Sequence, residues 1–245
     1  MRHIKHIAIA LVIAFSIPVG LLAEAQAMNH TKSLDARQKS IVTIAAFTAD
    51  GDMERLDKAL TEGLEAGLTV SEIKEVLVQM YAYAGFPRSL NGLFAFMRVL
   101  DERKSAGILD EPGKAASPLP PDMDKDVYGA KVRASLAGQD QIPSPSEWQL
   151  FAPVIDTYLK EHLFADIFAR DVLDFQSREL ATIGALANMQ GAGGQLRFHL
   201  GAAMNTGLSA AQLEDFIAVL RAKVGEPEAS QAAALLEEVL SARGK

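Results

Sequence analysis

Apolar residues recur along this chain with the spacing of an α-helix. Between residues 70 and 84 they fall at i, i+3, i+4, i+7 and i+8, which places them on one face of a helix. The residues concerned are Ile73, Val76, Leu77, Met80, Tyr81 and Ala84. No stretch shows the convincing alternation of apolar and polar residues that predicts a half-buried strand. We therefore predict an all-α fold.

The helical pattern occurs twice. Residues 34–46 match 173–185, and residues 67–73 match 207–213 with a shift of one position. This separation is far longer than the ~20–50 residues of solenoid repeats, so the chain is interpreted as a duplicated domain with two pseudo-symmetric repeats. Each repeat is predicted to hold four helices, over 35–50, 53–66, 70–84 and 87–104 in the first and 174–189, 194–206, 210–224 and 227–243 in the second.

Prolines between the two repeats predict an irregular linker. A short helix is expected near 124–136. A further helix, which opens at Ser146 and runs through Trp148, Phe151 and Leu159 toward the second copy, is expected to pack on the core. We divide the chain into a signal peptide over 1–27, a first repeat over 28–110, a linker over 111–145 and a second repeat over 146–245.

The N-terminal segment has the order of a secretory signal peptide. Basic residues at 2–6 precede an apolar run over 7–22, and small residues at 23–27 offer a cleavage site. An uncleaved membrane anchor is the alternative, against which Pro18 and Gly20 count. The pattern predicts a periplasmic or secreted bacterial protein with no membrane attachment after cleavage.

Charge and cysteine content exclude several kinds of function. The formal net charge is −7, which disfavours binding to nucleic acid or to an anionic membrane surface. The chain contains no cysteine, so it has neither disulfides nor thiolate metal sites nor a cysteine nucleophile. The zinc motif HExxH is also absent, and we expect neither a metal nor a cofactor.

Several segments resemble one known family. Residues 173–182, with the sequence LDFQSRELAT, followed by His199 and Gly207, are similar to the carboxymuconolactone decarboxylase family, a relative of the AhpD-type alkylhydroperoxidases. Residues 83–87, YAGFP, share this similarity. The resemblance covers both repeats and implies an AhpD-like helical fold. It also implies a homo-oligomer, and for a fused pair we expect a trimer.

The resemblance assigns candidate acid–base residues. In the peroxidase branch of the family, a glutamate, two cysteines and a histidine form a proton relay. Glu179 and His199 match the glutamate and the histidine, whereas the cysteine positions hold Ala192 and Gln195. Thiol peroxidase activity is therefore excluded, because neither residue can form a thiolate.

The first repeat differs from the second at the same positions. It carries Ser40 and Ala59 in place of the glutamate and the histidine, but it keeps the aromatic residues Tyr81, Tyr83 and Phe86. This asymmetry suggests a composite site in which one repeat supplies His and Glu and the other an aromatic wall. Arg88, near a predicted helix N-terminus, could bind an anionic group of the substrate.

Each candidate also has a structural interpretation. His199 lies on an apolar helix face and could be a buried, hydrogen-bonded structural residue. Glu179 could be a surface or capping carboxylate, Arg88 a solvated side chain and Tyr83 a core aromatic. Imidazole nevertheless exchanges a proton near neutral pH, which suits acid–base catalysis.

Two functions follow from these observations. The resemblance implies a cofactor-independent lyase that acts on a small carboxylated lactone or related acid. In that enzyme His199 and Glu179 would transfer a proton, Arg88 would hold the carboxylate, and Tyr83 and Phe86 would line the site. The alternative is a non-catalytic, oligomeric binding or assembly module on the same fold.

Overall fold

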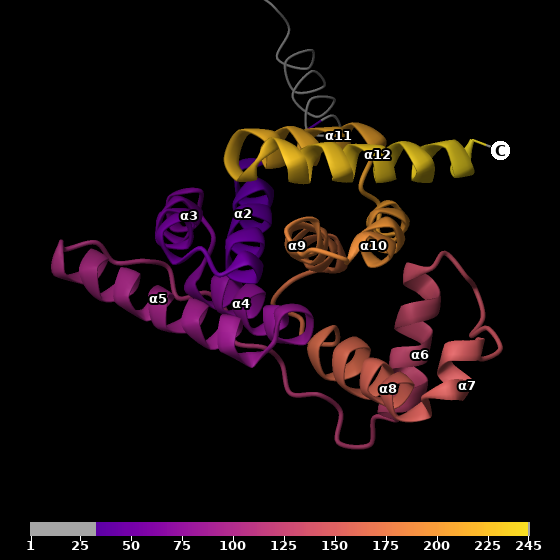
Figure 1. The fold of residues 1–245 in the computed structure, drawn as a ribbon. Helices are drawn as coiled ribbons and strands as arrows, with labels where there is room; N and C mark the ends of the chain where they lie inside the picture. Colours follow the sequence, from indigo (N-terminus) through magenta and orange to yellow (C-terminus); the bar gives the residue numbers. More distant parts are fainter. Residues whose placement is uncertain (1–32, 245) are drawn as a thin grey trace, which may run out of the picture.

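The computed structural model describes residues 33–244. Within this range all regular structure is helical, and no strand occurs (Figure 1). The all-α prediction is confirmed. The predicted signal peptide lies outside the described residues. None of the helices between residues 33 and 244 is both long and apolar enough to cross a membrane.

The eight helices expected for the two repeats are present, and their ends differ from the predicted ends by no more than two residues. In the first repeat they are α2 (Ala36–Asp50), α3 (Met53–Glu65), α4 (Val70–Ala84) and α5 (Phe86–Ser105). In the second they are α9 (Phe175–Ala187), α10 (Gly193–Asn205), α11 (Ala210–Val219), which continues as the π-helix η2 (Leu220–Val224), and α12 (Glu226–Arg243).

Equivalent helices begin with the same local interactions. At the start of α4, the Thr69 side chain accepts a hydrogen bond from the Glu72 amide, and the Glu72 carboxylate accepts one from the Thr69 amide. Ser209 and Gln212 form the same reciprocal pair at the start of α11. Such capping boxes satisfy amide groups that have no partner within the helix.

The two repeats pack together through α2 and α9, which make the most extensive contact between them. Both helices run through the centre of the molecule (Figure 1). A Cβ atom at Gly184 would lie 2.7 Å from the carbonyl oxygen of Val42. Glycine at this position therefore permits the close crossing of the two helices. α4 also packs against α9, and α11 with η2 packs against α2.

The linker and the start of the second repeat, up to residue 167, form a second layer. It contains α6 (Lys125–Leu136), α7 (Glu147–Phe151), α8 (Pro153–Thr157) and the π-helix η1 (Tyr158–Ile167). α6 and η1 pack side by side and bury a hydrophobic cluster of their own. Gly129 on α6 permits this close approach, because a Cβ atom there would clash with the Lys160 carbonyl group.

One expectation for this region is correct only in part, since Leu159 packs against the buried cluster but the start of the expected helix does not. We expected the helix that contains Trp148 to pack on the core, but the Trp148 side chain is about half exposed and Phe151 is 92% exposed. The physical reason is that η1, not the short helix α7, supplies the buried side chains opposite α6. The helix near 124–136 is confirmed as α6.

Candidate functional site

His199 and Glu179 form a hydrogen-bonded pair in the second repeat. α9 carries Glu179 and α10 carries His199, and the Nδ1 atom of His199 lies 2.8 Å from Oε2 of Glu179. Glu179 has no exposed surface, and 7% of the His199 side chain is exposed. With the ring proton on Nδ1, this atom donates and the carboxylate oxygen accepts. This leaves Nε2 of the imidazole to accept or release a proton.

The first repeat contributes an aromatic side chain to this pair. Tyr83, from the last turn of α4, lies edge-on to His199 with their ring centroids 6.0 Å apart. Phe198 lies edge-on at 5.1 Å. These contacts restrain the orientation of the imidazole. The structure thus brings Tyr83, His199 and Glu179 together, from two repeats, in the arrangement that the asymmetry of the repeats suggested.

Tyr83 keeps its hydroxyl proton at this site. Burial raises the pKa of Tyr83, the Glu179 carboxylate raises it further, and the nearby Thr182 hydroxyl opposes only part of this rise. A tyrosine in this state donates a hydrogen bond and does not act as a base near neutral pH. Of these three side chains, His199 and Glu179 are therefore the ones whose chemistry suits proton transfer.

Three polar atoms around the pair are buried without a hydrogen-bonding partner among the described residues. They are the Tyr83 hydroxyl oxygen, the Oε1 atom of Glu179 and the Nε atom of Arg178. An unpaired buried polar group costs about 1–3 kcal/mol, so native proteins contain few of them. Tyr83 lies on α4 and the other two residues lie on α9, so these polar groups gather where the two repeats meet.

A buried ionic network adjoins this pair through Arg178, which precedes Glu179 on α9. The Arg178 guanidinium, with no exposed surface, donates to Glu75 at 3.0 Å and to Gln79 at 2.9 Å. Gln79 in turn donates to the Thr182 hydroxyl at 3.0 Å. Glu75 also accepts from Arg170. Because Glu75 and Gln79 lie on α4, these bonds fix the first repeat against α9.

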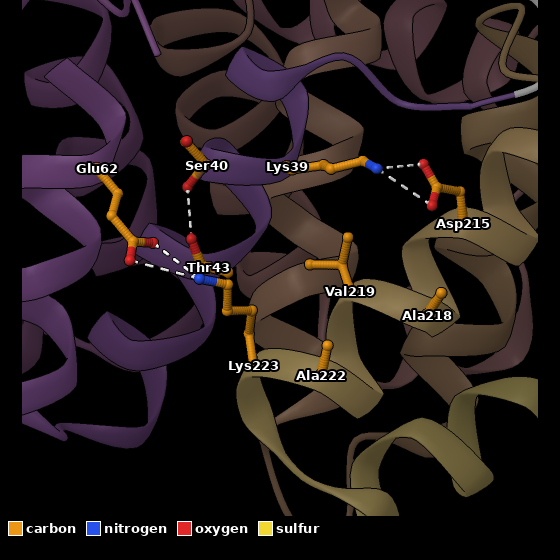
Figure 2. Close-up of a pocket in the computed structure, with 9 residues that line it drawn as sticks. All are labelled: Lys39, Ser40, Thr43, Glu62, Asp215, Ala218, Val219, Ala222 and Lys223. Atoms are coloured by element: carbon orange, nitrogen blue, oxygen red, sulfur yellow. Dashed lines mark hydrogen bonds and ion pairs between the residues drawn. The ribbon is translucent and has the colours of Figure 1, made fainter. Parts of the chain in front are cut away.

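The pseudo-symmetric counterpart of this site is a pocket of about 300 Å³ (Figure 2). The alignment of the repeats places Ser40 at the position of Glu179 and Ala59 at the position of His199. Ser40 lines the pocket, and its hydroxyl donates to the Ala36 carbonyl group within the same helix. The counterpart therefore lacks the acid–base pair.

Two ion pairs flank this counterpart pocket. Lys39 lies 2.9 Å from Asp215, and Lys223 lies 3.1 Å from Glu62 (Figure 2). The Lys39–Asp215 pair occupies the positions of Arg178 and Glu75 in the alignment, but Lys39 is 40% exposed whereas Arg178 is fully buried. The two repeats thus share an ion pair at equivalent positions, but they differ in its burial and in the presence of the His–Glu pair.

The structure does not bring Arg88 and Phe86 into contact with the His199–Glu179 pair. Among the described residues, the hydrogen-bond and ring contacts of His199 are made with Glu179, Tyr83 and Phe198. Arg88 does lie in the first turn of α5, as predicted, but its guanidinium donates to the carbonyl group of Ala49.

Phe86 is directed toward another part of the molecule. Its ring is 64% exposed and stacks on Tyr81 with a centroid distance of 4.4 Å. The reason is the turn at Gly85, whose φ of 86° starts α5 in a new direction after Tyr83. Such a backbone conformation is accessible to glycine and costly for other residues.

The sequence analysis missed the ionic network of Arg178 with Glu75 and Gln79. The sequence does contain an indication of this network, because charged and amide residues interrupt apolar helix faces at these positions. As for metals, residues 33–244 contain no group of three or more His, Asp or Glu side chains placed to hold an ion.

Comparisons with known proteins agree with the duplicated architecture. Residues 20–97 and residues 153–238 each match the model of the Carboxymuconolactone decarboxylase family, and together these stretches make up more than half of the chain. An uncharacterized protein of Methanocaldococcus jannaschii is 28% identical over 72 residues, which cover 29% of this chain and 67% of that protein. Its name states no activity.

Proposed function

The chain belongs to the carboxymuconolactone decarboxylase family, and from this premise we propose that it is a cofactor-independent enzyme in which His199 and Glu179 transfer a proton. The proposed substrate is a small carboxylated lactone or a related acid. The observation that supports this function best is the 2.8 Å hydrogen bond between a fully buried glutamate and a histidine that retains a small exposed edge.

The proposed reaction requires one acid and one acceptor of electrons. The bond between the carboxylate and the neighbouring carbon breaks, carbon dioxide leaves, and the electron pair moves into the conjugated carbonyl group of the substrate. Protonated His199 then delivers a proton to carbon. Glu179 stabilises the imidazolium before this transfer, and in this proposal the Tyr83 hydroxyl donates to the negative charge that develops on oxygen.

This proposal gives Arg88 and Phe86 no role in the reaction. The Arg88 guanidinium already binds the Ala49 carbonyl group, and Phe86 stacks on Tyr81. In the alternative function, a non-catalytic binding or assembly module, His199 would be structural. The near-complete burial of the His199–Glu179 pair is the observation that favours this alternative.

A screen of small lactones and carboxylic acids separates the two functions. Thermal shift measures binding, and proton NMR of the same mixtures measures loss of the carboxylate. We expect at least one carboxylated lactone both to stabilise the protein and to be converted. Compounds that stabilise the protein without any conversion would contradict the enzymatic function and support the binding module.

We also propose that the chain forms a homo-oligomer, a trimer of fused pairs. Leu90, Phe94 and Met97 are exposed on one face of α5 at helical spacing. Contiguous exposed apolar residues of this kind mark interaction surfaces. Light scattering is expected to give the mass of three chains, and Phe94→Glu should reduce it. A single-chain mass for the unmodified protein at micromolar concentration would exclude the trimer.

A further inference from the structure

A second pocket lies between the end of α4, the start of α5, α8 and the π-helix η1. Its volume is about 680 Å³, within the range of ~300–1,000 Å³ that is typical of sites for small molecules. Three aromatic and three aliphatic side chains form most of its lining, namely Tyr81, Phe86, Tyr158, Ile155, Leu159 and Leu163. None of these residues contributes to the His199–Glu179 pair, so the pocket is a separate site.

The aromatic rings of this pocket present free surface. Phe86 is 64% exposed and Tyr158 is 60% exposed, although Phe86 stacks on Tyr81. Apolar surface left in water costs about 25 cal/mol per Å², so a ligand ring that covers these side chains gains free energy. Aromatic rings also favour offset-stacked or edge-on contacts with one another. This lining therefore favours an aromatic ligand.

One histidine in the pocket is oriented for hydrogen bonding. The Nδ1 atom of His162 lies 2.9 Å from Oδ2 of Asp166, and its ring lies 5.4 Å from that of Tyr81. Burial favours the protonated form of Asp166, but hydrogen bonds from Lys125 and His162 hold its pKa below the ordinary value. Asp166 thus remains an acceptor, and Nδ1 donates to it. In the tautomer with its proton on Nδ1, Nε2 of His162 is left to accept a hydrogen bond.

The charges around the pocket disfavour an anionic ligand. The Lys125 ammonium lies 2.7 Å from Asp166, so these two charges compensate each other. Glu161 then leaves the lysine and carboxylates of the lining with a net negative charge. An uncharged ligand with a hydroxyl group fits this environment better than a carboxylate does.

The backbone provides an independent indication of a site. Tyr158, His162 and Asp166 all lie on η1, a π-helix of ten residues. π-helical segments are rare, and they occur frequently at functional sites. Here the segment carries most of the polar groups of the pocket, while α4 and α5 supply the stacked rings.

We propose that this pocket binds a small, uncharged aromatic molecule that carries a hydroxyl group. The ring packs against Phe86 and Tyr158, and the hydroxyl donates to Nε2 of His162. The site is independent of the proton-transfer function proposed for His199.

Calorimetric titration of the full chain with β-naphthol and with its methyl ether tests this assignment. The two probes share an aromatic ring system, but only β-naphthol can donate a hydrogen bond. We expect β-naphthol to bind with one site per chain and the ether to bind about tenfold more weakly, since one net hydrogen bond corresponds to roughly that factor. Equal affinities, or no saturable binding of β-naphthol, would overturn the proposal.

Three variants locate the binding. His162→Phe keeps a ring but removes the acceptor, so it should bind both probes with equal, weak affinity. Phe86→Ala should weaken both probes about tenfold, because it removes the stacking surface. Phe151→Ala is the matched control, since Phe151 is also an exposed phenylalanine but lies outside the pocket. A loss in Phe151→Ala as large as that in Phe86→Ala would indicate non-specific adsorption and reject the site.

Discussion

Replacing His199 by alanine is expected to lower turnover of a substrate found in the screen by about 10²–10⁴-fold, the range for loss of a general acid–base group. Folding should survive, because the equivalent position of the first repeat already holds the buried Ala59. Steady-state kinetics measures the loss, and circular dichroism verifies the helical content. Glu179→Gln, which keeps a hydrogen-bond acceptor without the charge, should cause a smaller loss.

The structural interpretation of His199 predicts a different result. If the imidazole only fills and satisfies a buried site, His199→Ala lowers the melting temperature and leaves the turnover number unchanged. That combination would refute proton transfer by His199. The two interpretations are therefore distinguished by which quantity changes, the rate or the stability.

The second large effect is expected at Glu75. Glu75→Ala should lower the free energy of unfolding by about 3–5 kcal/mol, because it leaves the fully buried Arg178 without its carboxylate partner. Urea unfolding, followed by circular dichroism, measures this change. The effect should appear as a lower midpoint with a similar denaturant slope.

The duplication supplies a matched control for Glu75. Asp215 occupies the equivalent position in the second repeat and pairs with Lys39, which is 40% exposed. Exposed ion pairs contribute about 0–1 kcal/mol. Asp215 also accepts a hydrogen bond from the Leu34 amide at 2.8 Å, which contributes about 1 kcal/mol, so Asp215→Ala should still cost less than Glu75→Ala. Equal losses in the two variants would show that burial of Arg178 is not the cause.

The helices could be predicted because their signals are local. Apolar spacing and helix-start residues act within a few positions, so the predicted ends of α4 and α11 with η2 agree with the structure. The pairing of Tyr83 with His199 could also be inferred, since it follows from a comparison of the two repeats. In both cases the necessary information lies in short segments or in their alignment.

The remaining features depend on how distant segments pack. Arg178 and Glu75 are 103 positions apart, and only the contact of α4 with α9 brings them together. The direction of α5, and with it the placement of Phe86 and Arg88, depends on the backbone at Gly85. The spacing of residues along the sequence gives neither the packing of α4 against α9 nor the direction of α5. The proposal that Arg88 holds the substrate carboxylate could therefore not be tested without the structure.

The close crossing of α2 and α9 places two repeats of one polypeptide where two identical subunits could otherwise meet. In a symmetric homodimer, every substitution enters both equivalent sites at once, so neither can change alone. A single gene that encodes both halves removes that restriction. One half can then carry the histidine and glutamate while the other holds alanine and serine at the equivalent positions, so each chain has one His–Glu pair, not two.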